Sequence, residues 1–309
     1  MDDSVIHLLG ELTRCDVRLG ELARDDRVLR WAEAGSGQPV VVLDAALGEP
    51  GMLAWASVMP LVAPKAHAVA YDRAGIGLSD PMSPLTLDAQ VDDLTSVLEA
   101  CGDGPCIVVG HSWGGLLAQL VAWRRPDLVA GLVLIDPADE RYLATSPTDE
   151  LREGVVMGEA AIAQHASGEL PTTIRSVFSD FARQLSDDPA LAERALDAYI
   201  ASYATESQAR MVLDETLLVI DSLPRIQKMR ESQSLLDIPV VILSATTGTP
   251  KPQRERYTSF HAEVATSVLR GEHIVLPDTS HAANQERPAE IAGAINRIVD
   301  SARRGSRSG

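Results

Sequence analysis

A serine framed by glycines is the clearest chemical feature of this chain. The segment from Gly110 to Gly115 reads GHSWGG, and it follows the apolar run Cys106 to Val109 and precedes a stretch with helical spacing. A serine on so tight a strand-to-helix turn has a strained backbone and an exposed hydroxyl. Glycines at 110 and 114 remove collisions with the neighbouring elements. The pattern therefore predicts that Ser112 is a nucleophile.

A serine hydroxyl needs a base to take its proton at neutral pH. Among the seven histidines, His281 is the best placed, because it lies in a loop after the last expected strand. That loop belongs at the same edge of a parallel sheet as Ser112, whereas His273 begins the strand and belongs at the opposite edge. His111 directly precedes the serine and should point elsewhere on so sharp a turn, so we expect a structural role for it. We predict His281 as the base.

The base needs a carboxylate that fixes its tautomer and stabilises the imidazolium. Asp136 directly follows the expected strand 132–135 and so lies at the required edge of the sheet. The loop after the expected strand 240–243 contains no carboxylate before Glu255. We predict Asp136 as the acid, with Glu255 as the alternative. Asp72 begins a glycine-rich loop, and we expect it to bond the backbone of that loop instead.

Acyl transfer also needs two N–H donors that face the developing oxyanion. The backbone N–H of Trp113, the residue after the serine, is one candidate. The loop after the expected strand 40–43 supplies the other, and Leu47 is the best candidate within it. We predict an oxyanion hole formed by Trp113 and Leu47, and we expect the Trp113 indole to line the substrate pocket.

Short β-rich runs alternate with helical stretches over residues 27–138. This alternation indicates a largely parallel sheet that is covered by helices on both faces. Strand patterns resume at 238–243 and again at 273–276, and a last helix is expected from about Pro288 to Ser301. The sheet should therefore be completed by segments from both ends of the chain.

Between these segments, from about 139 to 236, the sequence contains helical windows and no convincing strand. One helix should begin at Pro189, because Asp188 is a good N-cap and proline suits the first turn. The pattern predicts an all-helical insertion.

Aromatic residues recur at three- or four-residue spacing within two helical windows of this insertion. They are Phe178, Phe181, Tyr199 and Tyr203. Such a stripe either lines a substrate pocket or packs one helix onto its neighbour, and the sequence leaves both interpretations open.

The composition narrows the range of partners. With 27 basic and 44 acidic residues the net charge is −17, which argues against nucleic acid or an anionic membrane as the main partner. Three cysteines without metal-ligand spacing argue against a disulfide framework and a metal site. No apolar run approaches the ~20 residues of a membrane helix, and the N-terminus lacks a signal-peptide pattern. We expect a cytoplasmic protein with a small-molecule substrate, and a homodimer stays open.

Together these features resemble the α/β-hydrolase superfamily over almost the whole chain, and within it the capped, serine-nucleophile branch similar to esterases and epoxide hydrolases. The resemblance implies an α/β fold with an eight-stranded, mostly parallel sheet flanked by helices. A helical cap, residues 139–236, would follow the sixth strand, and residues 1–138 and 237–309 would form the core. Two features depart from the family: Ala45-Ala46 replaces the usual His-Gly pair, and Asp136 precedes the cap although the acid commonly follows it.

This framework predicts a serine hydrolase that cleaves a carboxylic ester, lactone or thioester of a small molecule through an acyl-enzyme, without cofactor or metal. Related folds also perform lyase, cyclase or acyltransferase chemistry with the same triad, and the sequence leaves these alternatives open. Dehalogenases and epoxide hydrolases of this scaffold use a carboxylate at the elbow, so Ser112 argues against both. A non-catalytic small-molecule binding protein is the third alternative, which the undamaged triad disfavours.

Overall fold

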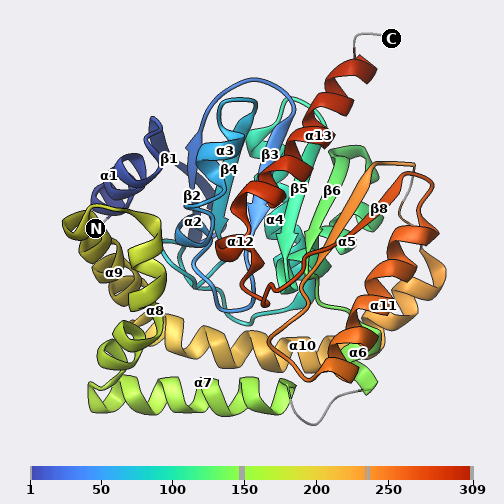
Figure 1. Cartoon of the computed structure of the whole chain (residues 1–309). Coiled ribbons are helices and arrows are strands. Elements are labelled where there is room, and N and C mark those ends of the chain that lie inside the picture. The colour runs from blue at the N-terminus through green and yellow to red at the C-terminus, as the bar shows by residue number, and fades with distance from the viewer. Residues whose placement is uncertain (1, 146–149, 234, 236, 307–309) are drawn as a thin grey trace.

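Eight strands form one sheet at the centre of the computed structural model, which describes residues 2–145, 150–233, 235 and 237–306 (Figure 1). The strand order is β1-β2-β4-β3-β5-β6-β7-β8. Strand β2 is antiparallel to both of its neighbours, and every other pair is parallel, so the predicted eight-stranded, mostly parallel sheet is confirmed. The strands are β1 (Val17–Arg24), β2 (Arg27–Ala34), β3 (Val40–Asp44), β4 (His67–Asp72), β5 (Cys106–His111), β6 (Val129–Ile135), β7 (Val240–Ser244) and β8 (Gly271–Val275).

Helices cover both faces of this sheet. In β3, Val40 and Val42 join a buried cluster with α4, α5 and α11, whereas Val41 and Leu43 join a second cluster with α2, α3 and α13. Because both faces are buried, the central strands are continuous apolar runs, which is why the sequence revealed them. The helices of this core are α1 (Asp2–Thr13), α2 (Gly51–Ala54), α3 (Met59–Val62), α4 (Leu87–Cys101), α5 (Trp113–Arg124), α11 (Lys251–Ser267), α12 (Ala283–Glu286) and α13 (Pro288–Ser306), with the short 3-10 helix η1 (Pro126–Leu128).

Among the described residues between β6 and β7, the chain forms five helices, which we call the helical insertion. Figure 1 shows α7 and α10 running side by side below the sheet, and α9, on which α8 packs, lying next to α1. No strand occurs in the described residues of the insertion. Its helices are α6 (Glu140–Thr145), α7 (Glu150–Ser167), α8 (Leu170–Leu185), α9 (Pro189–Tyr203) and α10 (Glu206–Ser232).

Some elements of the fold were not predicted from the sequence. Strand β1 was not expected, because it lies at the sheet edge and its side chains are half-buried or exposed. The last helix continues beyond the expected Ser301 to Ser306. Within the described part of the chain, no helix has the length and apolar composition that crossing a membrane would require.

The start of α9 allows a test of local stability. The side chain of Asp188 accepts a hydrogen bond from the Ala190 N–H at 2.9 Å, so the predicted N-cap is confirmed. We expect Asp188→Ala to lower the free energy of unfolding by about 1 kcal/mol, because the first turn loses this acceptor. Urea denaturation measures the change. Asp187→Ala, at the exposed neighbouring position, is the control, and equal effects of both substitutions would contradict the capping role.

Candidate active site

Ser112 occupies the turn between β5 and α5 with φ 53° and ψ −117°, a conformation that residues with a side chain rarely adopt. Its N–H donates to the carbonyl of Ile135 at 3.0 Å, and its carbonyl accepts from the Ala138 N–H at 2.8 Å. A Cβ at position 110 would lie 2.3 Å from the carbonyl oxygen of Gly114. The turn therefore requires glycine at position 110, as the sequence predicted.

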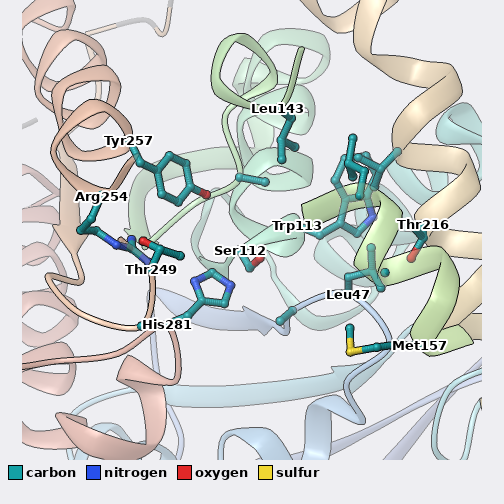
Figure 2. Close-up of a pocket in the computed structure, with 16 residues that line it drawn as sticks. Leu47, Ser112, Trp113, Leu143, Met157, Thr216, Thr249, Arg254, Tyr257 and His281 are labelled. Carbon is teal, nitrogen blue, oxygen red and sulfur yellow. The ribbon is translucent and has the colours of Figure 1, made fainter. Parts of the chain in front are cut away.

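His281 and Asp136 meet at the carboxyl edge of the sheet. His281 lies in the loop between β8 and α12, Asp136 directly follows β6, and the His281 Nδ1 lies 2.6 Å from the buried Asp136 Oδ2. Figure 2 shows the imidazole of His281 facing Ser112 across a shared cavity. Glu255, the alternative acid, is exposed and lies 3.7 Å from Lys251. The structure brings Asp136, and not Glu255, to His281.

Arg254 is a further partner of Asp136. Its Nη1 lies 2.9 and 2.8 Å from the two carboxylate oxygens, and the Ala245 N–H donates to Oδ1 at 3.1 Å. Burial alone would raise the pKa of Asp136, but the hydrogen bond and charge of His281, with the charges of His261 and Arg254, outweigh it. The pKa of Asp136 therefore lies below its ordinary value, which keeps it ionised. The sequence carried no signal for Arg254, which lies 118 residues away on α11.

His111 supports the loop that carries His281. Its Nε2 donates to the backbone carbonyl of His281 at 2.7 Å, and the two rings lie 4.8 Å apart. Its Nδ1 is 3.6 Å from a carboxylate oxygen of Glu49. His111 thus contacts the candidate base through the backbone, in agreement with the structural role expected for it.

A second serine also contacts histidines. The hydroxyl of Ser244 lies 2.7 Å from Nδ1 of His261 and 2.8 Å from Nε2 of His273. Ser244 is fully buried and does not line the cavity beside Ser112. Contact with a histidine is therefore not enough to make a nucleophile, because a substrate must also reach the hydroxyl.

Two residues that line the cavity beside the candidate nucleophile have backbone N–H groups without a hydrogen-bond partner among the described residues. In the described part of the chain, neither the Trp113 N–H nor the Leu47 N–H makes a hydrogen bond. On either side of Leu47, the Ala46 N–H donates to Glu49 and the Gly48 N–H donates to Glu215. Trp113 and Leu47 both line the cavity with Ser112 (Figure 2). Trp113 and Leu47 therefore remain the candidate donors of the predicted oxyanion hole.

The cavity beside Ser112 and His281 has a volume of about 390 Å³, which is the size of a small-molecule site. Figure 2 shows Arg254, Thr249 and Tyr257 on one side and Trp113, Thr216 and Met157 on the other. Helices α7 and α10 of the insertion supply part of its wall, and most of the lining is apolar. The other lining residues are Ala46, Ala138, Leu143, Leu151, Gly154, Val219 and Gly248.

The aromatic stripe of the insertion does not line this cavity. The ring of Phe178 stacks on Tyr199 and meets Tyr203 at a tilt, both at centroid distances of 4.8 Å, and Phe181 meets Tyr199 edge-on at 5.5 Å. The Tyr199 hydroxyl donates to the backbone carbonyl of Leu53 at 3.0 Å. Of the two interpretations left open for Phe178, Phe181, Tyr199 and Tyr203, the structure shows helix packing, because these rings pack α8 on α9 and on the core and do not line this cavity.

Asp72 organises its own loop, as expected. Its carboxylate accepts from the N–H groups of Leu78 at 2.8 Å and Met52 at 3.0 Å, and its carbonyl accepts from the Ser79 hydroxyl at 2.6 Å. Burial raises the pKa of Asp72 to about 6. None of these contacts reaches Ser112 or His281.

The low pKa of Asp136 predicts a pH-dependent contribution to stability. Because the pKa of the folded state lies below the unfolded value of about 3.9, the stabilisation is complete above that pH and is lost as the pH falls through the folded pKa. Urea titrations should show that Asp136→Asn is less stable than wild type at pH 7. We expect the difference to shrink by about 1 kcal/mol between pH 7 and pH 3. A difference that does not change with pH would contradict this assignment.

Comparison with known proteins adds to this geometry. Lipase LipV of Mycobacterium tuberculosis is 49% identical over 75 residues, which cover 24% of this chain and 29% of the lipase, so the match spans less than a third of that relative. The sn-1-specific diacylglycerol lipase ABHD11 of Mus musculus is 25% identical over 227 residues, 71% of this chain and 67% of the relative.

The fold also matches solved structures. A loop variant of haloalkane dehalogenase DbeA from Bradyrhizobium elkanii superposes with a TM-score of 0.68 at 20% identity, over 94% of this chain and 99% of that one. At 20% sequence identity, this similarity shows a shared fold. The sequence profile of the alpha/beta hydrolase family matches residues 23–294. The chain therefore belongs to the alpha/beta hydrolase family.

Proposed function

We propose that this hydrolase cleaves a carboxylic ester, lactone or thioester of a small, largely apolar molecule through an acyl-enzyme. One observation carries the proposal: Ser112, His281 and the unbonded N–H groups of Trp113 and Leu47 all border a single apolar cavity. These are the groups that acyl transfer needs. The names of the two relatives above, both lipases, support an ester over other substrates of the family.

The geometry supports the following steps. His281 removes the hydroxyl proton of Ser112 through Nε2, while Asp136 accepts from Nδ1 and stabilises the imidazolium. The serine oxygen bonds to the substrate carbonyl carbon, and the N–H groups of Trp113 and Leu47 receive the oxyanion. The C–O or C–S bond of the leaving group then breaks, and the imidazolium returns the proton to that group. Water, deprotonated by His281, hydrolyses the acyl-serine and restores the free hydroxyl.

Removal of the Ser112 hydroxyl tests the nucleophile. We expect Ser112→Ala to abolish covalent labelling by a fluorophosphonate probe, because the probe forms its bond with the serine oxygen. Hydrolysis of p-nitrophenyl butyrate should fall by several orders of magnitude. Gel fluorescence and initial rates measure these two losses.

Ser244→Ala is the matched control, since Ser244 contacts two histidines but is fully buried and lies outside the cavity. This variant should label like wild type. Equal labelling of Ser112→Ala and wild type would contradict the proposed mechanism.

The apolar wall predicts a preference for longer acyl chains. Met157 lines the cavity from α7 yet is 61% exposed, so its replacement should leave the fold intact. We expect Met157→Glu to lower kcat/KM about tenfold for p-nitrophenyl octanoate, because a charge at the wall weakens apolar contact with the acyl chain. The value for p-nitrophenyl acetate should change less than about twofold, since a two-carbon acyl group does not extend far from Ser112.

Val156→Glu provides the comparison, because Val156 is exposed on the same helix and does not line the cavity. If both variants lose activity equally toward the octanoate, a general charge effect and not the cavity wall explains the loss.

A further inference from the structure

A carboxylate of the helical insertion is buried against the loop that carries Leu47. Glu215 lies on α10 and is fully buried. Its Oε2 accepts a hydrogen bond from the Gly48 N–H at 2.6 Å. From the same helix, the Gln208 side chain donates to the Gly48 carbonyl at 2.5 Å. Helix α10 therefore holds both backbone groups of the residue next to Leu47.

Arg73, directly after β4, joins this carboxylate to the rest of the loop. Its Nε and Nη2 donate to the two oxygens of Glu215 at 2.8 and 3.0 Å. Its Nη1 and Nη2 also donate to the backbone carbonyls of Ala45 at 2.8 Å and Ala46 at 2.6 Å. Leu47 is thus flanked on one side by residues bonded to Arg73 and on the other by a residue bonded to Glu215.

The side chain of Trp113, whose backbone N–H is the second candidate donor, is connected to the same carboxylate. Gln90 of α4 donates from its Nε2 to the Glu215 Oε1 at 2.6 Å, and its Oε1 accepts from the Trp113 indole at 2.9 Å. Each oxygen of Glu215 therefore accepts two hydrogen bonds. All four bonds lead to the segments that carry Leu47 and Trp113.

We propose that Glu215 is a positioning residue that orients the Leu47 N–H donor of the oxyanion hole and, through Gln90, holds the side chain of Trp113, the residue that carries the other donor, so that the hole is complete only when α10 is seated on the core. This inference rests on the proposed function and adds to it a requirement on the helical insertion. Glu215 does not line the cavity, and it acts through Gly48, Arg73 and Gln90. A donor displaced by a fraction of an ångström would stabilise the oxyanion less while substrate binding is retained.

Another buried carboxylate of the insertion provides a matched control. Glu140 is also fully buried, and it pairs with Arg230 at 2.5 and 2.9 Å. Both residues belong to the insertion, and neither bonds to the loop of residues 45–48 or to Trp113 among the described contacts. Loss of this pair should destabilise the fold, since it leaves a buried charge without its partner, without moving the oxyanion donors.

The experiment compares Glu215→Gln with Glu140→Gln. An amide at 215 has one acceptor oxygen in place of two, so two of the four hydrogen bonds are lost. For p-nitrophenyl butyrate we expect kcat to fall about a hundredfold while KM changes less than about threefold. The inhibition constant of butylboronic acid should rise by a similar factor to the fall in kcat, because its tetrahedral serine adduct places an oxygen where the oxyanion forms. Glu140→Gln should keep wild-type kcat and boronate inhibition.

The following outcomes decide the inference. Parallel losses of kcat and boronate affinity that are specific to Glu215→Gln support it. Equal effects of both substitutions, or wild-type boronate inhibition in Glu215→Gln, overturn it. If Glu215→Gln does not fold, the same measurements are made on Glu215→Asp, which keeps the charge beside Arg73 and shortens the side chain by one methylene. Parallel losses of kcat and boronate affinity in Glu215→Asp support the inference. Wild-type kcat and boronate affinity in that variant overturn it. A wild type that does not hydrolyse the ester would count against the proposed function, whereas an active wild type matched by Glu215→Gln counts against this inference alone.

Discussion

The parallel register of β5, β6 and β7 is the constraint on which the candidate site depends. His111 pairs with Ile135, and Ile135 pairs with Leu243, so these strands end at the same level of the sheet. Ser112 and Asp136 follow directly, and each donates its N–H to a carbonyl of the neighbouring strand. Both residues have positive φ, and the paired strand ends hold these strained conformations. The paired strand ends are therefore sufficient to place the candidate nucleophile and the candidate acid at the same edge of the sheet, without contacts from the loops.

Buried ion pairs connect the candidate site to helices that lie away from this edge of the sheet. A buried carboxylate is costly unless a cation and hydrogen bonds compensate it. Asp136 has Arg254 of α11 as well as His281, and Glu215 of α10 has Arg73 of the core. Each pair joins segments that are more than 100 residues apart in the chain. The electrostatic environment of the site thus depends on helices on both sides of the cavity, one of them in the insertion.

The residues at strand ends could be predicted, whereas those on helices could not. The glycine-framed turn predicts Ser112, and His281 and Asp136 could be predicted beside it because the carboxyl ends of parallel strands share an edge, whatever lies between them in sequence. Glu215 and Arg254 lie on helices, where a charged residue in an amphipathic pattern has no feature that distinguishes a buried partner from a solvated one. The aromatic stripe at Phe178 has the same ambiguity, because helical spacing identifies an apolar face and not what covers it.

By itself, the amino-acid sequence determined the α/β class, the glycine-framed turn at Ser112 and the candidate base and acid. These features depend on local backbone sterics and on the order of strands, and both can be read from the residue types and their spacing in the sequence. Only the tertiary structure decided that α7 and α10 wall the cavity, that Arg254 contacts Asp136, and that Glu215 bonds to the loop beside Leu47. The physical reason is that such contacts depend on how one helix face meets a distant loop, and local propensity does not contain that information.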